Sequence, residues 1–156
     1  MEQRLNYLEV GPGVVKAMFG LGGYLAQCGL ETSLLNLLYF RVSQINGCAF
    51  CLDMHSKDLR AAGETEQRLY LLDAWRESPF YSDRERAALA WAEAVTLLNE
   101  GEVTDKVYEQ ARAEFSEQEL VNLTLAVVTI NGWNRFNIAF RTTPGSYQPA
   151  AAHAAV

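Results

Sequence analysis

The chain has little cysteine and histidine and no cluster of basic residues. Only three of its 156 residues are cysteine and two are histidine, too few for the disulfide framework of a small secreted domain. Thirteen Lys and Arg residues stand against 19 Asp and Glu residues, which gives a formal net charge of −6. This balance argues against binding to nucleic acid, because phosphates are neutralised by grouped Lys and Arg side chains.

The sequence also lacks a segment typical of a signal peptide or a membrane span. Residues 1–9 are polar and carry both charge signs, unlike a secretory signal. The longest apolar stretch, residues 120–130, is interrupted by Asn122, Thr124 and Thr129 and is too short to cross a bilayer. We therefore expect a cytoplasmic protein with no membrane partner, in a reducing compartment where cysteines do chemistry, bind metal or pack.

Apolar residues recur with helical spacing almost throughout, and alternation of period two is nowhere sustained. The segments 82–85 and 116–119 both have the capping-box pattern, a hydroxyl N-cap with Glu three residues later. We predict an all-α fold of about six to seven helices, with one domain over residues 1–145 and a C-terminal tail over 146–156. The helices are expected at residues 14–27, 32–44, 48–62, 65–73, 82–99, from 104, and from 116 to 134 or beyond.

Two of the expected helices are apolar on more than one side. Four leucines and a valine cover most of the helix at 32–44, and in the helix at 82–99 Leu89 and Leu97 lie opposite the stripe that contains Trp91. Such a helix is buried between neighbours or at a subunit contact. Because a chain of this length has limited room for several wholly buried helices, we expect a homo-oligomer: a dimer, trimer or hexamer.

The segment most informative about function is Cys48-Ala-Phe-Cys51, followed by His55. Successive helical residues turn by about 100°, so the two cysteines and the imidazole fall within about 60° of one another on one face. The cysteine Cα atoms would lie about 5 Å apart, within disulfide range. Unpaired N–H groups at a helix start also favour a thiolate. The spacing predicts a reactive thiol, a resolving thiol and a proton acceptor.

Two other interpretations of these three residues remain open. Cysteine is among the most buried residue types and a histidine can be satisfied in a core, so packing alone would account for them. All three are also acceptable zinc ligands, but a structural site needs a fourth, which only Cys28 or His153 is left to supply. We expect no metal and no other cofactor.

The run from Arg41 to Gly63, with Cys48, Cys51 and His55 inside it, closely resembles the core of the AhpD-like alkylhydroperoxidases of the carboxymuconolactone decarboxylase superfamily. The similarity extends through residues 85–96 and 131–145. The resemblance implies an all-helical fold, obligate homo-oligomers and reduction of a peroxide by a cysteine pair, which a lipoyl-bearing protein or another dithiol reductant restores. It also implies that Cys51 attacks the peroxide, Cys48 resolves the product and His55 relays protons.

One position departs from the family pattern. The relay usually includes a Glu twelve residues before the first motif cysteine, and that position is Asn36 here. An amide can orient an imidazole, but it cannot take its proton or stabilise imidazolium by charge. Glu93 is a candidate substitute for this carboxylate. The alternatives for Glu93 are a solvated surface position or a structural pair with Arg41, Arg135 or Arg141.

We therefore expect an antioxidant peroxidase that uses Cys48, Cys51 and His55, with Asn36 and Glu93 as candidate relay residues. The alternative is a non-catalytic oligomer that senses redox state or binds a ligand, with an incomplete relay. A decarboxylase-type acid-base enzyme that uses His55 without the thiols is less favoured, because that branch of the superfamily lacks the cysteine pair.

Overall fold

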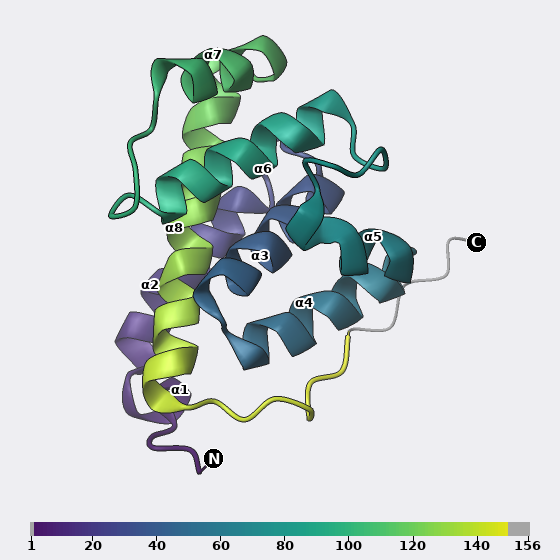
Figure 1. Cartoon of the computed structure of the whole chain (residues 1–156). Helices are drawn as coiled ribbons and strands as arrows, with labels where there is room; N and C mark the ends of the chain where they lie inside the picture. Colours follow the sequence, from purple (N-terminus) through teal and green to yellow (C-terminus); the bar gives the residue numbers. More distant parts are fainter. Residues whose placement is uncertain (1, 150–156) are drawn as a thin grey trace, which may run out of the picture.

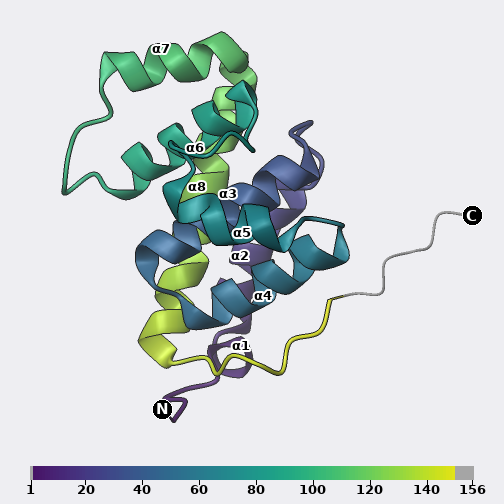
Figure 2. The same cartoon turned by 45° about the vertical axis from the view of Figure 1, so that its right-hand side comes forward.

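The computed structural model describes residues 2–149, and all regular structure within this range is helical. The prediction of an all-α fold is confirmed. The long helix α8 lies against α2, α3 and α6, and α3 also contacts α4 (Figures 1 and 2). None of the described helices has both the length and the hydropathy needed to span a bilayer. The elements are α1 Tyr7–Val10, α2 Pro12–Leu25, α3 Thr32–Asn46, α4 Ala49–Ala61, α5 Glu66–Leu71, the 3-10 turn η1 Leu72–Ala74, α6 Asp83–Thr96, α7 Asp105–Glu114 and α8 Glu117–Phe140.

All seven expected helices are present, and α1 is an addition. A helix of four residues is too short to show a helical period, so the spacing of apolar residues gave no sign of it. The side chain of Asn6 caps α1 by accepting a hydrogen bond from the backbone N–H of Leu8 (3.3 Å). The helix matters for the site because it places Tyr7 in a buried position beside α8.

Both predicted capping boxes are formed. The hydroxyl of Ser82 accepts from the backbone N–H of Glu85 (3.2 Å), whose carboxylate accepts from the N–H of Ser82 (2.8 Å). Ser116 and Glu119 make the same pair of bonds, at 3.3 Å and 2.8 Å. Because each box satisfies two N–H groups that the helix leaves free, the starts of α6 and α8 could be located from sequence.

Helix α3 lies between two clusters of buried apolar side chains. Leu34, Leu38 and Val42 belong to the cluster shared with α6, α7 and α8. Leu37 and Phe40 belong to the cluster shared with α4, α5, η1 and α6. Residues 87–93 of α6 are also all buried. The two helices predicted to be apolar on several sides are therefore buried within a single chain, which needs no second copy to cover them.

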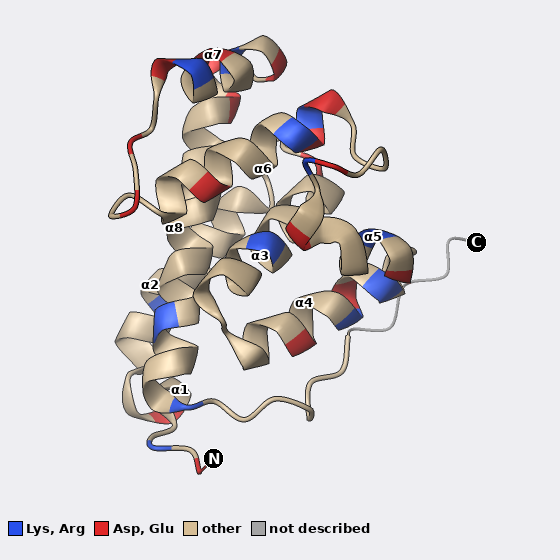
Figure 3. Cartoon of the chain, in the orientation of Figure 1, with Lys and Arg blue, Asp and Glu red and all other residues tan. Residues whose placement is uncertain are grey.

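The surface that does lack cover is that of α2. Its only charged residue is Lys16, and three of its large side chains are exposed by half or more: Val14 (52%), Phe19 (63%) and Tyr24 (52%). Figure 3 shows that α2 and the neighbouring turns of α8 carry few charged residues. We call the exposed surface of α2, which carries Val14, Phe19 and Tyr24, the α2 face. Large apolar side chains exposed along a helix with a single charged residue mark an interaction site more often than a solvated surface.

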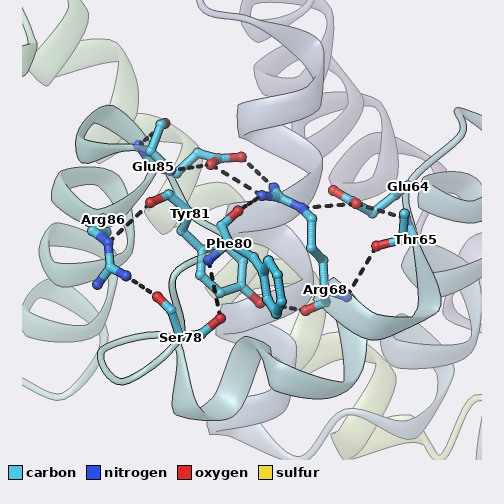
Figure 4. Close-up of polar contacts among 9 residues, drawn as sticks. Glu64, Thr65, Arg68, Ser78, Phe80, Tyr81, Glu85 and Arg86 are labelled. Atoms are coloured by element: carbon cyan, nitrogen blue, oxygen red, sulfur yellow. Dashed lines mark hydrogen bonds and ion pairs between the residues drawn. The ribbon is translucent and has the colours of Figure 1, made fainter.

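Polar contacts hold the connection between η1 and α6 in place. The guanidinium of Arg68 on α5 pairs with Glu64 (3.0 Å) and with Glu85 on α6 (2.5 Å), and it also donates to the carbonyl of Phe80 (Figure 4). The hydroxyl of Tyr81 donates to the carbonyl of Arg68 (2.5 Å). The second core cluster, which includes Tyr81, is thereby closed between α5 and α6.

Candidate active site

The two motif cysteines form a disulfide at the start of α4, with Cα atoms 5.3 Å apart. Gly47 ends α3 with a φ of 68°, a left-handed conformation that glycine adopts readily. Cys48 follows as the N-cap of α4, and its Sγ accepts from the backbone N–H of Cys51 (3.3 Å). The predicted helical geometry and Cα separation are confirmed, with Cys48 just before the helix and Cys51 in its first turn.

A cavity of about 420 Å³ opens beside Cys51. Its walls come from α1, α2, α3, α4, α8 and the segment that follows α8. Cys51 and His55 line it and Cys48 does not, although both cysteines are only 1% exposed. Among the described residues that line the cavity, none is Asp, Glu, Lys or Arg. Six lining side chains are aromatic: Tyr7, Phe19, Tyr39, Phe50, Trp133 and Tyr147.

His55 lies in this cavity one helical turn after Cys51 and is 7% exposed. Its ring packs near that of Tyr39, with centroids 5.5 Å apart. Neither ring nitrogen has a hydrogen-bond partner within residues 2–149. Burial lowers the pKa of His55 to about 4, since the charged imidazolium is disfavoured away from water. The imidazole is therefore neutral at pH 7, and it lines the same cavity as Cys51 with neither nitrogen hydrogen-bonded in the described structure.

Asn137 on α8 is a site residue that the sequence analysis missed. Its Nδ2 donates to the Sγ of Cys51 (3.4 Å) and to the carbonyl of Trp133 (3.0 Å). Its Oδ1 accepts from the hydroxyl of Tyr7 (3.0 Å). A local motif search has no access to a contact across 86 residues. The sequence did offer one signal, since Asn137 is an amide in an aromatic stretch near Phe136 and Phe140. An amide buried there requires hydrogen-bond partners, which marks it as a candidate site residue.

Asn36, the position of the expected relay carboxylate, is half-buried on α3. It lies one turn before Tyr39, whose ring contacts that of His55. Asn36 does not line the cavity, and no hydrogen bond joins its side chain to His55 in the described structure. Asn36 therefore lies near Tyr39, the ring neighbour of His55, but is not hydrogen-bonded to His55 itself.

Glu93 is buried, which excludes the solvated alternative, but it lies away from the thiols. Its Oε1 accepts from Arg41 Nε and from Trp75 Nε1, both at 2.8 Å. Its Oε2 pairs with Arg76 (2.5 Å). Glu93 does not line the cavity, and its two oxygens are occupied by these partners. The structure assigns it to the structural pair with Arg41 that was the alternative interpretation, and it does not bring Glu93 to Cys51 or His55.

The segment after α8 runs back along α4 (Figure 1). Asp53 accepts from the backbone N–H of Gly145 (2.9 Å) and pairs with Lys57 (2.9 Å). The hydroxyl of Tyr147 donates to Asp58 (2.7 Å), and the ring of Tyr147 lines the cavity. Residue 147 was assigned to the tail, yet it contributes to the site. We call residues 142–147 the strap.

Metal ligands were also considered from the sequence. Within residues 2–149 no three His, Cys, Asp or Glu side chains are grouped so as to hold a metal ion. His153, one of the two spare ligands considered, lies outside the described residues, as does the alanine-rich end of the chain.

Comparison with known proteins identifies the family. The model of the carboxymuconolactone decarboxylase family matches residues 12–94, a range that includes the cysteine pair and His55. The chain is 45% identical to the protein YdfG of Bacillus subtilis over 139 residues, 89% of this chain and 95% of that protein. A solved structure from Agrobacterium tumefaciens, ATU0492, is named as a candidate AhpD antioxidant defence protein. Its sequence is 42% identical to this chain, and the two structures match with a TM-score of 0.89 over 94% of this chain and 100% of that one.

A peroxidase-related protein from Ralstonia eutropha with an AhpD core shares the fold at 20% identity, with a TM-score of 0.78 over 89% of this chain and 74% of that chain. The match of the family model over more than half of this chain, together with the Bacillus relative, settles the family. The chain belongs to the carboxymuconolactone decarboxylase family and has the AhpD-like helical fold.

Proposed function

We propose that this protein is a peroxide-reducing thiol-disulfide oxidoreductase in which Cys51 attacks the peroxide and Cys48 resolves the product. The observation that carries the proposal is the asymmetry of the cysteine pair. Cys51 lines the cavity beside an unpaired imidazole, whereas Cys48 caps α4 outside the cavity lining. A substrate in the cavity meets the sulfur of Cys51 first.

The reaction transfers two electrons from the dithiol to the peroxide. The Cys51 thiolate attacks one peroxide oxygen, the O–O bond breaks, and the departing alkoxide takes a proton to become an alcohol. Cys51 is then a sulfenic acid. The Cys48 thiolate attacks its sulfur and displaces hydroxide, which leaves as water after protonation. The product is the Cys48–Cys51 disulfide, whose Cα separation the structure accommodates at 5.3 Å.

His55 supplies the proton transfer in this scheme. Its unpaired nitrogen accepts the Cys51 thiol proton and returns it to the alkoxide. The pKa of about 4 belongs to the disulfide state, in which no thiolate faces the ring. A thiolate at Cys51 favours the imidazolium and so raises the pKa of His55 in the reduced protein.

The apolar cavity suggests which reactants fit. Its aromatic walls lack charged side chains among the described residues, which suits an organic hydroperoxide better than an anionic substrate. Each cycle ends on the disulfide, so turnover requires an external dithiol, either a small dithiol or a lipoyl-bearing protein. Exchange would proceed by thiolate attack on the disulfide.

The test is hydroperoxide consumption with dihydrolipoamide as reductant. We expect turnover by the wild-type protein and a fall to the uncatalysed rate in Cys51→Ser. Cys28→Ser is the matched control, because Cys28 is the free, half-buried cysteine and does not line the cavity; it should retain the wild-type rate. Equal rates for wild type and Cys51→Ser would refute the proposal.

The second candidate is a redox sensor that is oxidised once and does not turn over. The observation in its favour is that no carboxylate is hydrogen-bonded to His55 within the described chain, with Asn36 at the expected relay position. It predicts one disulfide formed per peroxide and no further consumption when dihydrolipoamide is present. Counting turnovers in the same assay separates the two functions.

We also propose that the protein is a homo-oligomer and that the α2 face is its subunit interface. The face is apolar and exposed in one chain, and a second copy carries the same face, as a two-fold symmetric contact requires. Phe19 belongs both to this face and to the cavity lining. An interface here would therefore cover one side of the cavity.

A further inference from the structure

We propose that Asn137 stabilises the Cys51 thiolate of the reduced protein, and that Tyr7 holds the Asn137 amide in the orientation that allows this. The inference rests on the proposed thiol chemistry. It assigns a role in that chemistry to Tyr7 and Asn137, which both lie outside the cysteine-histidine motif and outside the residues matched by the family model.

The orientation of the Asn137 amide is determined by its partners. The Trp133 carbonyl can only accept, so the atom 3.0 Å from it must be Nδ2. The second Nδ2 hydrogen then faces the Sγ of Cys51 at 3.4 Å. The Oδ1 atom is left for the hydroxyl of Tyr7, at 3.0 Å. Asn137 is 5% exposed and Tyr7 8%, so water has little access to compete for these bonds.

Apart from His55, the cavity lining around Cys51 offers a thiolate little other support. The titratable groups that line the cavity with it are His55 on α4, Tyr39 on α3, Tyr7 on α1 and Tyr147 on the strap. Burial, the leading cause, raises the pKa of Tyr39 and of Tyr147 to about 12 and also raises that of Tyr7. The tyrosines are therefore neutral at pH 7. No Lys or Arg among the described residues belongs to this lining.

The start of α4 does not serve Cys51 either. The backbone N–H of Cys51 donates to the sulfur of Cys48, so this helix-end donor acts on the resolving cysteine. The side-chain donor bonded to the attacking sulfur is Asn137. A hydrogen bond to the charged form of a group lowers its pKa, and bonds to ions are about twice as strong as bonds between neutral groups. Asn137 thus favours the thiolate at Cys51 and offsets the helix-end donor that favours a thiolate at Cys48.

The experiment measures the Cys51 pKa in reduced Cys28→Ser/Cys48→Ser protein, in which Cys51 is the only thiol. Thiolate absorbance at 240 nm and the rate of iodoacetamide alkylation are followed against pH. We expect Asn137→Leu to raise the pKa by about one unit, a tenfold loss of thiolate at neutral pH. Tyr7→Phe, which removes only a hydroxyl, should raise it by about a third of a unit or more.

The chain provides a matched control on the same helix. Asn122 is also buried on α8, and its Oδ1 also accepts from a tyrosine hydroxyl, that of Tyr24 (3.0 Å). Its Nδ2 donates to the carbonyl of Cys28 and not to a sulfur (3.2 Å). Asn122→Leu and Tyr24→Phe should leave the Cys51 pKa unchanged, which separates loss of a buried Tyr–Asn pair from loss of the donor to sulfur.

An unchanged Cys51 pKa in folded Asn137→Leu overturns the inference, and so does an equal rise in Asn122→Leu. If Asn137→Leu does not fold, Tyr7→Phe decides: a rise supports the inference and no change overturns it. No peroxide enters these titrations. Absence of peroxidase activity would therefore count against the proposed function alone, and an unchanged pKa in an active enzyme would count against Asn137 alone.

Discussion

His55 is the least satisfied polar side chain of the site. Burial without partners for its ring nitrogens is costly for a charged imidazolium, and the lowered pKa of about 4 reflects that cost. A structural histidine would have its nitrogens hydrogen-bonded in the folded protein. The unpaired nitrogens of His55, one helical turn after Cys51, are instead free to take a thiol proton. This favours a chemical role over the packing interpretation of the motif.

The same burial predicts a pH dependence of stability. The unfolded chain binds a proton at His55 near pH 6.5 and the folded chain only near pH 4, so the contribution of His55 to stability falls as pH decreases through this window and levels off below it. The difference is about 3 kcal/mol. Urea unfolding of the disulfide form of wild type and His55→Phe, between pH 4 and 8, should show a shallower loss in the variant. Parallel curves would contradict this.

Asn36→Glu tests whether the missing carboxylate limits the site. Residue 36 lies on α3 one turn before Tyr39, the ring neighbour of His55. A carboxylate there is expected to raise the pKa of His55 above about 4 and to increase the peroxidase rate several-fold, because it stabilises imidazolium by charge. NMR titration of His55 and the turnover assay measure both. Asn36→Gln, which adds length without charge, should change neither; a folded Asn36→Glu with an unchanged pKa and rate would contradict the idea.

At the scale of elements, the strap depends on α4 for its position. Asp53 holds the Gly145 N–H, and Lys57 donates to the carbonyl oxygens of Gly145 (3.3 Å) and Tyr147 (3.0 Å). The bond from Lys57, followed by that from Gly145, lowers the pKa of Asp53. The anchor therefore stays charged below the usual range of an aspartate. The helix that carries the thiols also carries the anchor of the strap beside them.

Asp53→Ala should loosen the strap without unfolding the protein, because Asp53 is a half-buried residue at the surface of α4. We expect chymotrypsin to cleave after Tyr147 several-fold faster in this variant, since loss of the backbone anchor exposes the segment. Glu66→Ala is the control: it removes an exposed acid of α5 whose one ion pair within residues 2–149 is a long one, to Arg60 (3.9 Å). Equal cleavage rates in Asp53→Ala and wild type would show that the strap is held by other contacts.

The elements also show what local sequence can and cannot predict. The capping boxes and the Cys48–His55 motif were predictable because each depends on residues within seven positions of one another. The short α1, the strap and the Asn137 bond were not, because they depend on contacts between segments far apart in the chain. A pair of Glu93 with Arg41 could be named from the sequence as one of several alternatives. Its partners Trp75 and Arg76 could not, since they come from the connection before α6.

At the scale of the molecule, the proposed oligomer uses the surface of α2, whereas the sequence led to the expectation of an oligomer through α3 and α6. The apolar sides of α3 and α6 are buried within one chain, whereas α2 exposes Val14 and Phe19. The length of the chain alone could not decide this, because it depends on how many neighbours each helix gains on folding. Mutations on the α2 face should therefore change the oligomeric state.

We expect light scattering with size exclusion to give a multiple of the 17.4 kDa chain mass for the wild type. Val14→Glu should shift the protein to a single chain, because Val14 is more than half exposed on α2 and a carboxylate is costly to bury in an interface. Leu98→Glu, an even more exposed position just after α6 (62%), should leave the mass unchanged. A wild-type protein that is already a single chain would contradict the proposed interface.

The account depends above all on Cys51 being the sulfur that receives the peroxide oxygen. The direct measurement is mass spectrometry of reduced Cys48→Ser protein after one equivalent of an organic hydroperoxide, with dimedone present to trap sulfenic acid. The account predicts one dimedone adduct, on Cys51, and in the wild type a Cys48–Cys51 disulfide without adduct. An unmodified Cys51, or an adduct on Cys28 in its place, would contradict it.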